Sequence, residues 1–225
     1  MPKNKSIRGI LDDFMNSDAY RNQERLLKER RKTIKTGKAV LHLEYIGEFT
    51  ETDLNEINDN LKKVNLQLSS FNKSGVFYNA LDEFSLDSFF VLSQPLISEI
   101  IKIIGTSALW DSIKWSLLYG WRKLKGKKYF KSSTGTIEEK EIKFGLNVKL
   151  DKNTEFNFKL EGDIDESTIE TSLDKILDFL KEQKPNKSYK TPDYAYFSKE
   201  KDMWIKVDVM EEITKRIKKN EKKKK

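Results

Sequence analysis

The chain of 225 residues has no cysteine and only one histidine, His42. Without cysteine it can form neither a disulfide scaffold nor a thiolate metal site, and it has no cysteine nucleophile. A Ser-His-Asp triad needs a nucleophile beside its histidine, and no Gly-x-Ser-x-Gly motif supplies one. Neither glycine-rich phosphate-binding motif, Gly-x-x-x-x-Gly-Lys-Ser/Thr or Gly-x-Gly-x-x-Gly, is present. We therefore expect no metal, no cofactor and no small-molecule substrate, and the sequence favours a protein that is not an enzyme.

A long uninterrupted apolar run is also missing. The longest apolar region, residues 89–121, is interrupted by Glu99, Lys102, Asp111 and Lys114. A membrane-spanning helix needs ~20 mainly apolar residues, and one central charge costs about 2.5–3.5 kcal/mol on insertion scales. The first residues lack the apolar stretch of a signal peptide. We expect a cytoplasmic protein.

Charged side chains are abundant, at 35% of the residues, and the net charge is +7. The 13 Phe, 8 Tyr and 4 Trp residues are nevertheless enough to build a core. We expect four segments along the chain. They are a basic N-terminal helical extension over 1–38, a core domain over 39–188, a C-terminal hairpin and helix packed on the core over 189–217, and a disordered lysine-rich tail over 218–225.

The pattern of apolar residues predicts the elements of the core. Period-two alternation predicts a strand over 40–49 and hairpins over 142–160 and 194–209. Helical spacing predicts helices over 50–68, 96–124 and 165–183, the first and last capped by Thr50 and Asp165. Residues 70–88 are predicted to be a connection. The result is an α+β fold with a mainly antiparallel sheet, helices packed on one face and the core order β-α-α-β-β-α.

Four segments in this order carry a resemblance: LHLEYIGEF, TETDLNEINDNLKK, PLISEIIKIIGTSALWDSIKWSLL and DESTIETSLDKILDFL. Over residues 39–183 the chain resembles small effector-associated α+β adaptor domains of bacterial conflict and anti-phage systems. The resemblance rests on the order of elements and the texture of the helices, and it carries over no functional residue. It implies a role as an adaptor or coupling domain without catalysis.

One basic block is a candidate contact surface for nucleic acid or an anionic surface. Tyr129 and Phe130 interleave its cations, and bases could stack on such rings while the cations contact phosphates. The alternative is that these cations simply complement a helix C-terminus, whose dipole favours positive charge. The candidate contact residues are Arg122, Lys123, Lys125, Lys127, Lys128, Tyr129 and Lys131.

The apolar region 89–121 holds a second candidate surface. Trp110, Trp115, Tyr119 and Trp121 are amphipathic aromatics of the kind found at protein and membrane interfaces. The alternative is a buried helix, because a helix that is apolar all round normally lies in the core.

Two carboxylate–lysine pairs, Glu138 with Lys140 and Glu141 with Lys143, are compatible with a metal-dependent nuclease. The alternative is ion pairing on an exposed strand face. We favour ion pairing over the nuclease hypothesis.

From these features we expect a non-enzymatic interaction protein, an accessory or adaptor subunit of a bacterial complex of the antiviral defence type, with a protein as partner. The alternative is a nucleic-acid-binding protein that uses the block 122–131 and the basic ends. A further alternative is membrane association through 89–121.

Overall fold

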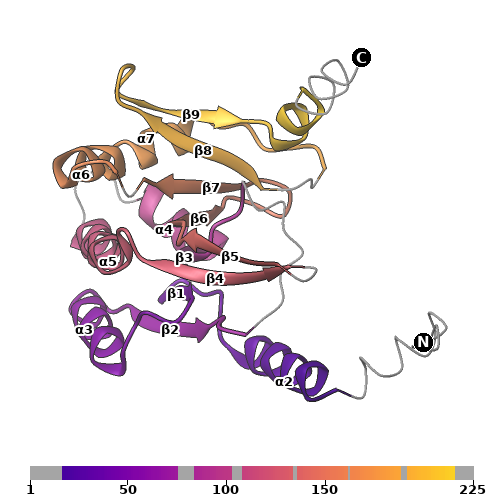
Figure 1. Ribbon diagram of the computed structural model, residues 1–225. Coiled ribbons are helices and arrows are strands. Elements are labelled where there is room, and N and C mark those ends of the chain that lie inside the picture. Colours follow the sequence, from indigo (N-terminus) through magenta and orange to yellow (C-terminus); the bar gives the residue numbers. More distant parts are fainter. Residues whose placement is uncertain are drawn as a thin grey trace, which may run out of the picture.

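Figure 1 shows the computed structural model, which describes residues 17–75, 84–102, 108–133, 136–161, 163–188 and 192–215. Its centre is a seven-stranded sheet in the order β2-β1-β3-β6-β7-β8-β9, and a separate two-stranded hairpin is formed by β4 and β5. The predicted α+β class is confirmed. The strands are β1 Val40–Tyr45, β2 Gln67–Asn72, β3 Ser88–Leu92, β4 Lys128–Ser133, β5 Thr136–Glu141, β6 Phe144–Lys149, β7 Glu155–Leu160, β8 Asp193–Ser198 and β9 Met203–Val207.

The sheet is mixed, because antiparallel and parallel neighbours alternate along it. The pairs β1–β3, β6–β7 and β8–β9 are antiparallel. The pairs β1–β2, β3–β6 and β7–β8 are parallel. A parallel pair needs a crossover connection, and each of these three has a helical one. The helices are α2 Asp18–Lys32, α3 Glu51–Lys62, α4 Gln94–Lys102, α5 Ala108–Leu124, α6 Glu166–Asp174 and α7 Ile176–Glu182.

One face of the sheet is apolar and is covered by α3, α5, α6 and α7 (Figure 1). Alternation along each strand sends Leu41, Leu43 and their counterparts on the neighbouring strands to this face. The helix α5 comes very close to the sheet at Gly120, where an added Cβ would lie 2.6 Å from Phe144 Cζ. The side chains buried completely between the layers include Leu41, Leu43, Phe90, Leu92, Ile113, Leu117, Leu146, Val148, Phe156, Phe158 and Leu173.

The structure corrects five predicted boundaries. The strand predicted over 40–49 ends at Tyr45, and the single helix predicted over 165–183 is two helices, α6 and α7. The helix opened by Thr50 ends at Lys62, and Leu68 belongs to β2 instead. The connection predicted over 70–88 contains the end of β2 and the first residue of β3. The single helix predicted over 96–124 is two helices, α4 and α5, and Gly105 between them lies outside the described residues.

Both predicted hairpins are found, as β6–β7 and as β8–β9, and β8–β9 continues the same sheet as the core. A helical segment over 209–215 follows β9. The N-terminal extension contains α2, which begins after the N-cap Ser17. The lysine-rich tail over 218–225 lies outside the described residues.

A prediction about stability follows from Gly145 in β6. A Cβ at this position would clash with the Phe158 carbonyl oxygen of β7 and lie 3.0 Å from Leu86 Cδ1. Because the first obstacle is backbone, Gly145→Ala should lower the free energy of unfolding by an amount at the upper end of about 1–3 kcal/mol or beyond. Urea unfolding measures this. The control Lys149→Ala, at an exposed position of the same strand, should stay within about 0.5 kcal/mol of wild type. Equal unfolding midpoints for the two variants would contradict the prediction.

Candidate functional site

The strongest cluster of titratable groups lies on the other face of the sheet, beneath α2. His42 and Glu44 alternate with Leu41 and Leu43 in β1, so they point away from the helix-covered face. Glu44 is only 3% exposed. The Arg30 guanidinium of α2 donates three hydrogen bonds to its carboxylate, at 2.8–3.0 Å. Lys35 Nζ donates a fourth to Glu44 Oε1, at 3.1 Å. Glu44 is therefore held by two cations that flank it from the N-terminal segment.

These contacts decide the protonation state of Glu44. Burial on its own raises the pKa of a carboxyl group, because it disfavours the charged form. The contact with His42 and the charges of Arg30, Lys73 and Lys35 outweigh burial and lower the pKa of Glu44 to about 2. Glu44 is therefore a carboxylate that serves as the anchor for α2.

Lys73, just beyond β2, is the third buried member of the cluster. It is 3% exposed, and its Nζ lies 4.4 Å from the centre of the Phe89 ring. Burial lowers the pKa of Lys73 to about 8, against the opposing charges of Glu44 and Asp87. Its backbone N–H also donates to Tyr45 O at 2.6 Å, which continues the ladder between β1 and β2.

His42 completes the cluster. Its Nδ1 lies 3.3 Å from Ser69 Oγ, and its Nε2 lies 3.6 Å from Glu44 Oε1, too far for a hydrogen bond. Histidine, glutamate and a lysine of lowered pKa are residue types used in acid–base catalysis. Here His42, Glu44 and Lys73 are each at most 3% exposed, so the cluster offers no atom to a substrate. Its evident role is to fasten α2 to the sheet.

The basic block 122–131 does not form one continuous cationic surface in the described part of the chain. Most of its cations contact an acidic residue from a distant element or from the opposite strand. The pairs are Arg122 with Glu166, Lys123 with Asp53 at 2.9 Å, Lys127 with Glu48 at 3.9 Å and Lys128 with Glu139 at 2.8 Å. Lys125 lies 4.6 Å from the centre of the Trp121 ring. The side chain of Lys131 lies outside the described residues.

The four aromatic residues predicted as contacts separate into two groups. Trp110 and Trp121 are 5% and 3% exposed and belong to the core, and Trp121 Nε1 donates to Glu161 O at 2.9 Å. Trp115 and Tyr119 are partly exposed on α5, with ring centres 5.3 Å apart. Tyr119 donates to Asp53 at 2.8 Å and to Glu56 at 3.0 Å. Among the helices described, none has the length and apolar character needed to cross a membrane.

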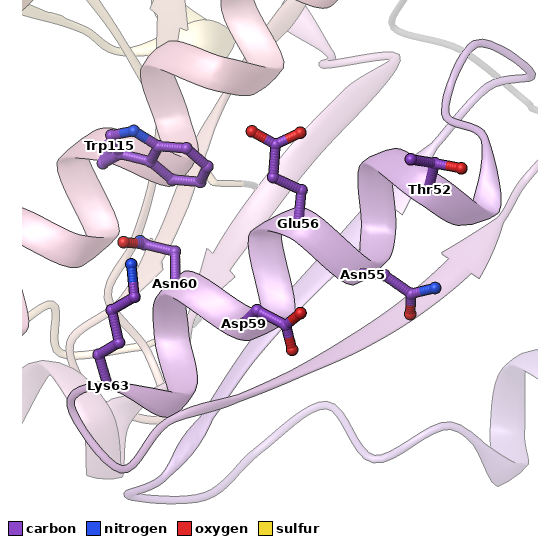
Figure 2. Close-up of a pocket in the computed structure, with 7 residues that line it drawn as sticks. All are labelled: Thr52, Asn55, Glu56, Asp59, Asn60, Lys63 and Trp115. Carbon is purple, nitrogen blue, oxygen red and sulfur yellow. The ribbon is translucent and has the colours of Figure 1, made fainter.

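Trp115 lines an open groove of about 470 Å³ between α3 and α5. Figure 2 shows Glu56 and Asn60 of α3, and Lys63 just after its end, reaching toward Trp115, whereas Asn55 and Asp59 point away from it. Asn60 is already engaged, because its amide donates to Ser112 O and Oγ at 3.1 and 2.7 Å. The groove is thus a polar seam between two packed helices.

The predicted carboxylate–lysine pairs lie in β5 and just after it. Lys140 Nζ lies 3.4 Å from a Glu138 carboxylate oxygen, so these two residues pair with each other. Within the described ranges there is no group of three or more side chains suited to hold a metal ion. Ion pairing on an exposed ribbon accounts for Glu138 and Lys140.

The hairpin β4–β5 carries a feature that the sequence analysis missed. Phe130 and Ile137 are 74% and 75% exposed. Phe130 is opposite Glu139, and Ser132 is opposite Ile137, so Phe130 and Ile137 are diagonal neighbours on one face of the ribbon. We call these two side chains the hairpin patch. No alternation in the sequence could predict this face, because Phe130 directly follows Tyr129 and Ile137 stands alone among polar residues.

Tyr129 holds the base of this hairpin against the sheet. Its hydroxyl donates to Asp87 Oδ1 at 3.1 Å, and Lys143 N donates to Asp87 Oδ2 at 2.9 Å. Burial, together with the Asp87 charge, raises the pKa of Tyr129, so the hydroxyl stays a donor. The base of the hairpin is fixed while its outer face is left open.

Comparison with protein-family models, with curated proteins and with solved structures finds no match to this chain. The resemblance to effector-associated adaptor domains therefore stays a prediction. The features of the structure that bear on function are the cluster under α2, the groove at Trp115 and the hairpin patch.

The buried Lys73 predicts a rise in stability at alkaline pH. Its pKa of about 8 in the folded state lies below the ordinary 10.5, so the unfolded chain binds more protons between these values. The free energy of unfolding should therefore increase by about 3 kcal/mol from pH 8 to pH 10.5, at about 1.4 kcal/mol per pKa unit. Urea unfolding across this range should show the rise in wild type and in the exposed control Lys63→Met, but not in Lys73→Met. The same rise in all three proteins would refute it.

Glu44 predicts a loss of stability at acid pH. Because its folded pKa of about 2 lies below the ordinary 4.5, its stabilisation is complete above pH 4.5 and disappears as the pH falls toward 2. In Glu44→Gln the free energy of unfolding at pH 7 should be lower by about 3 kcal/mol, and it should fall less steeply as the pH is lowered. It should also speed tryptic cleavage within α2, which Arg30 would no longer hold. The control Glu48→Gln should behave like wild type, and unchanged cleavage in Glu44→Gln would count against the anchoring role.

Proposed function

We propose that this protein is a non-enzymatic interaction protein, an accessory or adaptor subunit of a bacterial complex of the anti-phage type, and that the hairpin patch contacts its protein partner. The observation that carries the proposal is the exposure of Phe130 and Ile137, 74% and 75%, as diagonal neighbours on one face of β4–β5. The resemblance of the sequence segments over 39–183 to those of adaptor domains supports the same proposal.

The construction of the hairpin also supports a contact role. It is inserted between α5 and β6, and among the strands that the structure describes β4 and β5 pair with each other and with no strand of the main sheet. A two-stranded ribbon is marginally stable alone, so an anchor such as the Tyr129–Asp87 contact is needed to hold it in place. Exposed apolar side chains on a fixed support are typical of residues that become buried in a partner.

The fate of the acid–base groups supports a role without catalysis. His42, Glu44 and Lys73 are buried beneath α2 and hold it in place. Most cations of the block 122–131 have acidic partners, so the hairpin patch, more than the block, is the distinctive surface.

The test is a pull-down of the tagged full chain from its native host at low and high salt, with protein read by mass spectrometry and nucleic acid by absorbance. Wild type should retain a discrete protein partner at high salt. Phe130→Ser with Ile137→Ser should reduce its affinity for the purified partner at least about tenfold, since each buried side chain contributes about 1.5–3 kcal/mol and 1.4 kcal/mol is tenfold.

The matched control is Met203→Ser with Met210→Ser, which removes two other exposed apolar side chains, 49% and 50% exposed. It should bind the partner like wild type. Equal weakening by both double variants would contradict a specific role for the hairpin patch. Nucleic acid bound at low salt and lost at high salt, with no protein partner, would overturn the proposal in favour of the basic block.

A further inference from the structure

The strand β2 lies at one edge of the main sheet and differs from the other edge strands in having no charged side chain. Edge strands present unpaired backbone groups, and proteins commonly protect them with charged side chains. The other outer strand of the sheet, β9, contains Lys206, and β4 and β5 are rich in lysine and glutamate. The strand β2, with the sequence QLSSFN, has no charge, in a chain with 35% charged residues.

The backbone of β2 has a defined outward side. Gln67 N donates to Ala39 O at 3.0 Å and Lys73 N donates to Tyr45 O at 2.6 Å, so odd-numbered residues face β1. By the two-residue period, Leu68, Ser70 and Asn72 direct their N–H and C=O groups outward. Asn58 Oδ1 of α3 accepts the outward N–H of Leu68 at 2.9 Å.

The centre of this edge is open. In the described part of the chain no strand lies beyond β2 (Figure 1), and no hydrogen bond from the outer side reaches the Ser70 backbone. Leu68, Ser69 and Ser70 are partly exposed, and Gln67 and Asn72 are exposed. A strand could therefore pair with the backbone at Ser70 while the N–H of Leu68 stays bonded to Asn58.

We propose that β2 is the edge through which two copies of this chain pair, antiparallel and about a two-fold axis at Ser70, to form one continuous sheet. A two-fold interface requires a surface that is compatible with itself. In this register Ser70 is opposite Ser70 of the second copy, Leu68 is opposite Asn72 and Ser69 is opposite Phe71, so no charge meets a like charge. This inference goes beyond the proposed function and uses a different surface from the hairpin patch.

The test is sedimentation of the full chain over a range of concentrations. Wild type should be a dimer. Ser70→Pro removes the outward N–H but leaves the bonds of residues 67, 69 and 71 to β1, because proline is tolerated where the N–H of an edge strand faces out. Since a two-fold pair of Ser70 residues exchanges two hydrogen bonds, Ser70→Pro should raise the dimer Kd at least about tenfold. The matched control Ser70→Thr keeps the N–H and should remain a dimer.

A second variant guards against misfolding of the proline variant. Gln67→Lys with Asn72→Lys places cations at two exposed positions of the edge and should give a folded monomer, with the Tm that wild type shows at concentrations below its dimer Kd. In the wild-type dimer the Ser70 amide should exchange its hydrogen slowly, and in the lysine variant rapidly.

Three results would overturn the proposal. They are a wild-type chain that is monomeric at every concentration, a dimer that survives both Ser70→Pro and the lysine variant, and a monomer whose β2 instead binds a strand of another protein. Because the hairpin variants leave β2 intact, failure here and failure of the proposed function are distinguishable.

Discussion

The packing of helices on one face of a mixed sheet is the contact on which the rest of the structure depends. It buries Leu43, Phe90, Phe158 and their neighbours completely, and it lets each parallel pair of strands be joined across the same layer. It also leaves the second face of the sheet to be closed by other means. Near β1 that closure comes from α2, and it is electrostatic as much as apolar, because Leu26 of α2 is buried while Arg30 holds Glu44.

This division explains where the charges of the chain lie. A carboxylate buried beside two cations is stable in its charged form, but removing one partner leaves an uncompensated charge at considerable cost. The helix α2 and the sheet are therefore coupled through Glu44. On the outer surface the same chemistry is weaker, since exposed ion pairs such as Lys128–Glu139 contribute at most about 1 kcal/mol each. Those pairs neutralise most cations of the basic block. The hairpin patch, in the same hairpin, remains exposed and apolar.

Local patterns predicted the elements whose causes are local. The alternation over 142–160 predicted β6 and β7, and Thr50 and Asp165 do cap α3 and α6. The strand β3 was missed because its apolar residues run directly into α4, so that no change of period marks the boundary. The strand β2 was missed because it is mostly polar, and its parallel partner β1 lies across a whole helix.

The candidate sites show the same limit. The composition of 122–131 was plain in the sequence, but the acidic partners of Arg122 and Lys123 are more than forty residues away. Likewise, His42 alternates with Leu41 and Leu43 along β1, but its complete burial depends on how α2 and β2 come together. Exposure of Phe130 and Ile137 depends on the hairpin standing apart from the main sheet, which no local pattern encodes.

The order of strands has one more consequence, which concerns handedness. The strands β1 and β7 point the same way, because two antiparallel steps and one parallel step separate them. The crossover from β1 leads to one end of the sheet and the crossover from β7 to the other, yet α3, α6 and α7 cover the same face. The two crossovers therefore have opposite hands, and one of them is left-handed, whereas about 98% of such connections are right-handed. A distant relative of this protein would be recognisable by that topological signature even after its sequence had diverged beyond comparison.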